Sequence, residues 1–250
     1  MNTPRSVVID AFPESAFRHR DCDAVVCIDV MLTTTTLVTA AALGRRAFVA
    51  GSPRELRELA AGLTGALTAA RLEDGPPGWV EGPDSPSHLI RTNGDQRPLL
   101  LWSPPGTELI TNAAAGGSVL LAGFRNLSAT AAALAHHRRI ALLTAGCRQE
   151  LSCEDQMAAA WIAERLLDSG FDAADRRTGD MVRRWTGIAP SLAGWGNSAA
   201  HLRQAGRGED VDFVIAHVDD VEGACVCEGG EVRLEGVPVG VGVEREGRPR

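Results

Sequence analysis

The chain has 250 residues, six cysteines and a formal net charge of -7, with 44% hydrophobic and 23% charged residues. A length and composition of this kind are typical of a globular protein with a large core, folded as one sizeable domain or as two packed lobes. The negative charge argues against general nucleic-acid binding and against binding to a membrane surface, because both need a basic face.

No apolar run approaches the ~20 residues of a membrane span, and the first residues lack the apolar segment of a signal peptide. We therefore expect a cytoplasmic protein with reduced cysteines and no membrane partner. The cysteines form no C-x-x-C pair and no Cys/His ligand set, which argues against zinc. The chain contains neither lysine nor tyrosine, so Schiff-base chemistry and the lysine of phosphate-loop NTPases are excluded.

The first elements in chain order are two apolar strands, over residues 6–11 and 24–30. The second strand carries Asp29 at its end, and a helix that begins at Thr33 to Thr36 stops at Gly44. A carboxylate beside a hydroxyl-rich helix start suits a metal and a phosphate together. The same residues also suit a structural loop, in which they act only as caps.

Strand and helix then alternate. Residues 47–50 form a strand, and Ser52, Pro53 and Glu55 predict the N-terminal cap of an amphipathic helix. Residues 72–97 are rich in glycine and proline and predict a long irregular loop that carries Asp84, Ser85 and His88. The elements expected next are strands over 98–102, 118–122 and 139–144, and helices over 108–115, 128–137 and 152–169.

The last third of the chain is less regular. Its expected elements are helices or loops over 172–207, a strand over 212–217, a hairpin of strands 224–227 and 231–234, and a loose polar tail over 244–250. The alternation predicts an α/β fold, a three-layer α/β/α arrangement with a mostly parallel or mixed sheet, in a single domain over residues 1–243.

Four strand-to-helix loops carry polar residues, and the carboxyl ends of parallel strands meet at one edge of a sheet. These residues are Asp29 with Thr33, Thr34, Thr35 and Thr36; Ser103 with Gly106 and Thr107; Arg125 with Asn126 and Ser128; and Arg148 with Ser152, Glu154 and Asp155. Converging carboxylates suit Mg²⁺, and arginines clamp anions. Glu154 and Asp155 equally fit a structural role, because acids in the first turn of a helix are favoured by its dipole.

These segments resemble the motifs of the 2-phosphosulfolactate phosphatases, the Mg²⁺-dependent phosphatases of coenzyme M biosynthesis. Residues 28–36 are similar to the family signature I-D-V-L-R-A-S/T-S/T-T. Further segments match in the same order: 84–86 with N-S-P, 103–107 with T-T-N-G-T, 124–129 with F-L-N-A-S-A, and 145–155 with A-G followed by S-x-E-D. A late segment around Ser198, His201 and Asp210 is similar to the family's closing helix.

The resemblance implies Mg²⁺-dependent hydrolysis of the phosphate monoester of a small anionic acid, such as 2-phosphosulfolactate. It implies that Asp29, Glu154 and Asp155 bind the metal and act in catalysis. The residues that it implies for substrate binding are Thr33, Thr34, Ser85, Ser103, Gly106, Thr107, Arg125, Asn126, Ser128 and Arg148. Whether the protein forms a homodimer is left open.

The chain departs from the family motifs at three positions. Leu32 stands where the family has arginine, and Pro105 and Asp84 stand where it has asparagine. Losing an arginine removes a fixed positive charge and two parallel hydrogen bonds to an anion, and an acid near a phosphate repels it. Two alternatives therefore stay open. One is a non-catalytic relative that binds an anionic metabolite or a partner protein, and the other is a metal-dependent hydrolase of a different ester or sulfonate.

Overall fold

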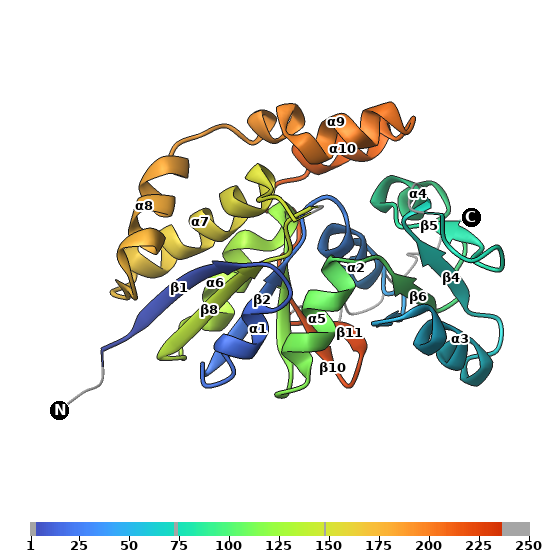
Figure 1. Cartoon of the computed structure of the whole chain (residues 1–250), viewed down its shortest axis with the longest axis horizontal. Coiled ribbons are helices and arrows are strands. Elements are labelled where there is room, and N and C mark those ends of the chain that lie inside the picture. The colour runs from blue at the N-terminus through green and yellow to red at the C-terminus, as the bar shows by residue number, and fades with distance from the viewer. Residues whose placement is uncertain (1–3, 73–74, 148, 237–250) are drawn as a thin grey trace, which may run out of the picture.

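The computed structural model describes residues 4–72, 75–147 and 149–236. In these residues the chain forms one sheet of eleven strands, flanked by helices (Figure 1). The strands are β1 (Ser6–Ala11), β2 (Ala24–Ile28), β3 (Ala47–Val49), β4 (Leu67–Ala70), β5 (Gly82–Pro83), β6 (Leu99–Trp102), β7 (Val119–Ala122), β8 (Arg139–Thr144), β9 (Asp172–Ala173), β10 (Ala224–Glu228) and β11 (Glu231–Glu235). The α/β class and the mixed, mostly parallel sheet predicted from the sequence are confirmed.

The α-helices alternate with the strands over most of the chain. They are α1 (Ser15–Arg18), α2 (Thr33–Ala42), α3 (Pro53–Gly62), α4 (Pro86–Arg91), α5 (Gly106–Ala114), α6 (Leu127–Leu134), α7 (Cys153–Asp168), α8 (Arg176–Trp185), α9 (Asn197–Gln204) and α10 (Gly208–Ala216). In the described ranges none of them is both long enough and apolar enough to span a membrane. All six cysteines are free thiols, as predicted.

The sheet has two parallel halves joined by a hairpin. One half contains β5, β4, β6 and β3, and the other contains β7, β2, β8, β1 and β9. Between them, β11 pairs antiparallel with β3 and β10 pairs antiparallel with β7, while β10 and β11 pair with each other. Since three consecutive antiparallel pairings separate the halves, the two halves run in opposite directions along the sheet.

Helices α2 and α5 lie between the two halves (Figure 1). Leu37 of α2 and Leu109 of α5 belong to one cluster of buried residues, which also contains Cys27 from one half and Leu101 from the other. Helices α6 to α10 cover the opposite face of the half that contains β2, and α3 covers the opposite face of β3 and β6. The sheet therefore wraps around α2 and α5, and this curvature brings the strand ends of both halves together.

Two helix boundaries follow the predicted signals. The Ser52 side chain accepts a 3.2 Å hydrogen bond from the Glu55 N–H at the start of α3. Gly44, with φ at +69°, follows the last turn of α2 in a left-handed conformation that glycine adopts without steric cost. Both signals depend on local chemistry, which is why the sequence alone predicts them.

Three expectations in the less regular regions were wrong. Residues 212–216 belong to helix α10 and His217 follows it, so the expected strand over 212–217 is absent; Val211 and Val214 are three residues apart and are buried on one helical face. The segment 72–97 contains β5 and α4, and Ser85 caps α4 by accepting a hydrogen bond from the His88 N–H. Strand β4 was not predicted at all. The predicted tail over 244–250 lies outside the described residues.

Candidate active site

Asp29 follows the last residue of β2 and is buried, with 3% of its surface exposed. Its Oδ2 atom accepts no hydrogen bond from the described residues. The loop that carries it is fixed by Thr34, whose hydroxyl accepts from the Asp29 N–H at 3.1 Å and lies 2.7 Å from the Ala122 carbonyl oxygen. Thr34, a predicted substrate ligand, is therefore bonded to backbone, while Asp29 presents an unsatisfied carboxylate oxygen.

The charge of Asp29 is strongly affected by its surroundings. Burial raises the pKa of its carboxyl to about 7; the cation of Arg71 opposes this rise, and the negative charges of Asp84 and Glu154 add to it. Burial also raises the pKa of Asp155 well above its ordinary value, with further contributions from the charges of Asp29 and Glu154. Four acids from distant parts of the chain thus interact electrostatically at one place.

Asp155 joins the loop after β2 to the loop after β8. Its Oδ1 accepts a 2.8 Å hydrogen bond from the Val30 N–H, and its Oδ2 accepts a 3.2 Å hydrogen bond from the Gly146 N–H. Its neighbour Glu154 is 1% exposed and accepts a 3.3 Å hydrogen bond from the Cys153 thiol. Asp155 therefore orients the backbone on which Asp29 stands, in addition to adding negative charge.

The start of α5 lies directly against Asp29. A Cβ atom at Gly106 would overlap both Asp29 Oδ2 and Thr33 Oγ1, so only glycine allows this approach. The Thr107 hydroxyl caps the same turn by accepting from the Ser103 N–H at 3.1 Å, while the Ser103 hydroxyl is buried and bonds to none of the described residues. The N–H groups at this helix start, which carry partial positive charge, thus face the acidic cluster.

The other half of the sheet contributes Asp84, which follows β5. Its Oδ2 lies 3.5 Å from the Thr33 hydroxyl, which is also 3.2 Å from the Ser103 carbonyl oxygen. Its Oδ1 is buried and has no hydrogen-bond partner among the described residues. The adjacent Ser85, a predicted substrate ligand, caps α4 and donates a 2.7 Å hydrogen bond to Asp210.

Three predicted substrate ligands are engaged elsewhere in the structure. Arg125 forms a two-pronged ion pair with Asp220, with N–O distances of 2.9 and 2.8 Å. Asn126 bonds to the backbone of its own loop, through Gly123 and Leu121, and the Ser128 hydroxyl donates to Asp219 at 2.8 Å. None of these bonds involves the acids around Asp29. Arg148 lies outside the described residues.

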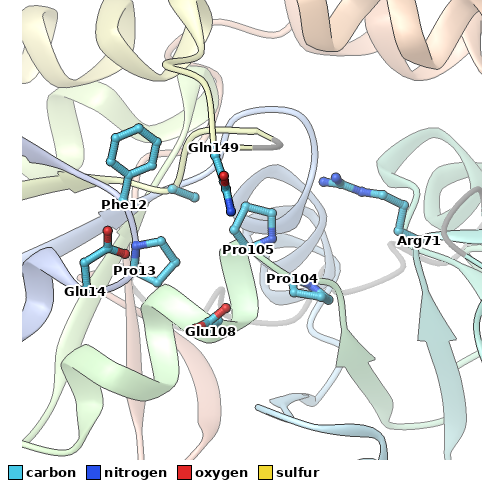
Figure 2. Close-up of a pocket in the computed structure, with 9 residues that line it drawn as sticks. Phe12, Pro13, Glu14, Arg71, Pro104, Pro105, Glu108 and Gln149 are labelled. Carbon is cyan, nitrogen blue, oxygen red and sulfur yellow. The ribbon is translucent and has the colours of Figure 1, made fainter.

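A cavity of about 610 Å³ opens beside these strand ends. Figure 2 shows Arg71 extending from one wall toward Pro105 and Gln149, with Phe12 and Glu108 on the other side. Arg71 also lines an adjoining cavity of about 310 Å³ together with Met31, Cys147, Ser198 and His201. Arg71 was not predicted as a site residue, because β4, the strand that it follows, was not predicted. The sequence does contain a signal for this strand, since residues 67–71 form a mostly apolar run that ends in a charged residue.

The oxygen atoms around Asp29 form a donor set that fits a metal ion completed by water and substrate. Within the described ranges, no three His, Cys, Asp or Glu side chains are arranged as a complete metal-binding set. The unpartnered carboxylate oxygens of Asp29 and Asp84 and the Ser103 hydroxyl are nevertheless oxygen donors, buried side by side with Thr33. Mg²⁺ is commonly held by only one or two carboxylates together with water and substrate phosphate, so this donor set fits it.

Comparison with known proteins identifies the family of the chain. A family model described as 2-phosphosulpholactate phosphatase matches residues 10–221, a range that contains every candidate residue named above. A protein of Thermotoga maritima is 29% identical over 162 residues, covering 62% of this chain and 70% of the relative. A protein of Thermotoga petrophila is 28% identical with the same coverage, and both are described as a probable 2-phosphosulfolactate phosphatase. The chain therefore belongs to the 2-phosphosulpholactate phosphatase family.

Proposed function

We propose that this protein is a Mg²⁺-dependent phosphatase that hydrolyses the phosphate monoester of a small anionic acid, similar to 2-phosphosulfolactate. The observation that carries the proposal is the buried Asp29 carboxylate at the end of β2, which has one unpartnered oxygen. Asp84 and Glu154 are close enough to raise its pKa, and Asp29 in turn raises the pKa of Asp155. Membership of the family supports the reaction type. An unpaired buried acid is costly to a fold and is typical of sites where chemistry takes place.

In this proposal Asp29 is the main protein ligand of the metal, and Asp84 adds a second carboxylate. Glu154 supplies negative charge beside them, and Asp155 does the same while it orients the loop of Asp29. When bound, Mg²⁺ would polarise the phosphoryl group and offset its negative charge. The raised pKa of Asp29 fits this role, because a carboxylate that lacks a partner in the folded chain gains one in the metal.

The substrate is assigned to the space between Asp29 and Arg71. The Gly106 N–H at the start of α5 would donate to a phosphoryl oxygen, whereas the Thr107 N–H already donates to the Ser103 carbonyl oxygen at 3.1 Å. The Thr33 and Ser103 hydroxyls lie beside this helix start. Arg71 lines the cavity of about 610 Å³ and would bind a second anionic group of the substrate. Arg125, Asn126 and Ser128 have a structural part in this proposal, in view of the bonds that they already form.

The direct test is phosphate release from a panel of phosphate esters by the purified protein. Esters of small acids with and without a sulfonate are compared, with Mg²⁺ and with EDTA. We expect EDTA to abolish release, and we expect Asp29→Asn to lower kcat at least 100-fold. The matched control is Asp168→Asn, the same change at an exposed position at the end of α7, which should retain full activity. Metal-independent release, or an active Asp29→Asn variant, would contradict the proposal.

A second candidate is a relative that binds an anionic metabolite or a partner protein without turning it over. It is favoured by Leu32, which is 1% exposed where the family motif has an arginine, and by the acid at position 84. The same panel separates the two functions. If no ester is hydrolysed and yet one of them raises the melting temperature in an Asp29-dependent manner, the binding function is correct.

A further inference from the structure

A buried ion pair lies between α4 and α10, outside the cluster around Asp29. Asp210, in the first turn of α10, is 3% exposed, and its Oδ2 accepts hydrogen bonds from Arg207 Nε at 3.1 Å and Nη2 at 2.7 Å. Its Oδ1 accepts from the Ser85 hydroxyl at 2.7 Å and from the Ser87 N–H at 3.1 Å. Both carboxylate oxygens are therefore fully used, and the pair joins segments about 120 residues apart in the sequence.

Arg207 extends the same network to the candidate active site. Its Nη2 donates to the carbonyl oxygen of Asp84, while its side chain is only 12% exposed. The carboxylate of Asp84 lies on the other side of this peptide, 3.5 Å from the Thr33 hydroxyl. One guanidinium thus connects Asp210 to the backbone that carries an active-site acid.

The segment that the ion pair contacts consists of short elements, of which α4 also packs into the core through Leu89. Strand β5 contains two residues and α4 contains six, so neither has the length that stabilises an isolated element. A buried ion pair adds little net stability compared with apolar packing, but it fixes a specific geometry, because removing one partner leaves a charge buried and unpaired. Such a pair is therefore suited to setting a position more than to adding stability.

We propose that Arg207 and Asp210 are positioning residues for the reaction at Asp29: they fix the backbone of Asp84 and Ser85, and through it the placement of the Asp84 carboxylate beside Thr33 and Asp29. The inference goes beyond the proposed function, although its kinetic readout rests on it. Neither residue touches the reacting atoms. Their effect must therefore pass through Asp84, and this dependence can be measured.

The test is a double-mutant cycle between positions 84 and 210. Asp210→Asn keeps an acceptor for Ser85 but presents an amide N–H₂ group to Arg207, so it removes the bonds that hold this guanidinium against the Asp84 carbonyl oxygen. In the wild-type background it should lower kcat at least tenfold and raise the Mg²⁺ concentration for half-maximal activity. In the Asp84→Asn background it should change kcat less than twofold. Asp212→Asn is the matched control, because this exposed acid on the same helix only pairs with Arg203 at 3.7 Å.

A second variant covers the case in which Asp210→Asn does not fold. Arg207→Lys keeps the cation but loses the forked donor geometry, and it should lower kcat by a smaller factor, again only when Asp84 is present. Equal losses of kcat in both backgrounds would mean that the ion pair merely stabilises the fold, and this result would overturn the inference. Wild-type kcat in both variants would overturn it as well.

The cycle has a second readout that does not need turnover. If wild-type protein hydrolyses no ester, the rise in melting temperature caused by Mg²⁺ alone is measured in the same variants. A rise that Asp210→Asn reduces only when Asp84 is present supports the positioning role, even though the phosphatase proposal has failed. An equal reduction in both backgrounds, or no effect of Mg²⁺ on any variant including the wild type, would overturn the inference.

Discussion

The Val30 N–H donates a 2.8 Å hydrogen bond to Asp155 Oδ1, across 125 residues of sequence, and Val30 is the residue that follows Asp29. The other oxygen of Asp155 accepts from the Gly146 N–H. One buried carboxylate therefore connects the ends of two neighbouring parallel strands, β2 and β8. The position of Asp29 depends on an acid that the sequence places at the start of α7.

Asp155→Asn should lower both stability and activity. The asparagine side chain has one oxygen acceptor, so either the Val30 or the Gly146 N–H loses its partner and is left buried beside an N–H₂ group. An unsatisfied buried donor costs about 1–3 kcal/mol, and we expect this loss in the free energy of unfolding measured with urea. Phosphate release should fall at least tenfold. Full activity in a destabilised Asp155→Asn protein would show that the loop geometry does not matter for catalysis.

The stability of the metal-free protein should decrease as the pH rises from about 4 to about 7. In the folded chain the Asp29 carboxyl keeps its proton up to a pKa of about 7, whereas in the unfolded chain it releases it near 3.8. The folded state thus binds more protons in this window, and the stability present below pH 4 is lost as the pH approaches 7, by up to about 1.4 kcal/mol per pH unit. Urea unfolding in EDTA at several pH values measures this slope. Asp29→Asn should reduce this slope without abolishing it, because burial also raises the pKa of Asp155, and Asp168→Asn should leave the slope unchanged.

Gly106→Ala should disturb the site directly. Its new Cβ would overlap Asp29 Oδ2 and Thr33 Oγ1, so α5 or Asp29 must move. We expect a loss of about 1–3 kcal/mol in stability, as for overpacked cores, and loss of most of the phosphate release. Gly62→Ala is the control: it lies in helix α3 with no atom within 4 Å of the new Cβ, and it should be neutral or slightly stabilising. Normal activity of the Gly106→Ala variant would show that the start of α5 is not part of the active site.

Breaking the ion pair between Arg125 and Asp220 should lower the stability of the protein and leave substrate binding unchanged. Asp220→Asn and Arg125→Leu both break an ion pair in which the arginine side chain is 10% exposed and the aspartate side chain 32% exposed. Because Asp220 is partly solvated, we expect a loss of only about 1–3 kcal/mol in unfolding free energy, with KM for the ester changed less than twofold. Arg46→Leu, which breaks a more exposed pair with Glu231, is the comparison. A tenfold increase in KM without a loss of stability would return Arg125 to the substrate-binding role predicted from the sequence.

The local part of the fold could be predicted from the sequence. Asp29 at a strand end and the cap at Ser52 depend on neighbours in the chain, and the structure contains both elements. Strand β4 was missed because Leu67 to Ala70 contains little β-branched sequence and is held mainly by burial in the sheet. Helix α10 was misread as a strand because its valines and isoleucine favour strands, and tertiary packing overrides that preference.

The acids of the candidate site could be predicted from the sequence, but the hydrogen bonds and ion pairs of the surrounding arginines could not. The spacing of the loops placed Asp29 at a strand end and Asp155 at the helix start that follows another strand, and parallel pairing of β2 with β8 brings them together. By contrast, the bond from Arg207 to Asp84 and the pair of Arg125 with Asp220 join segments that no local pattern relates. The arginines could be identified as cations from the sequence, but their partners depend on the curvature of the sheet.

The central hairpin has a consequence for synthesis on the ribosome. Strands β10 and β11 lie in the middle of the sheet but come last among the described strands, so a nascent chain that ends after α10 carries two half-sheets whose inner edges, β7 and β3, have no neighbour. Unpaired strand edges are sites of aggregation. Translation must therefore reach the hairpin before the two half-sheets can join, and a message truncated just upstream of it would yield a product prone to aggregate instead of a smaller folded protein.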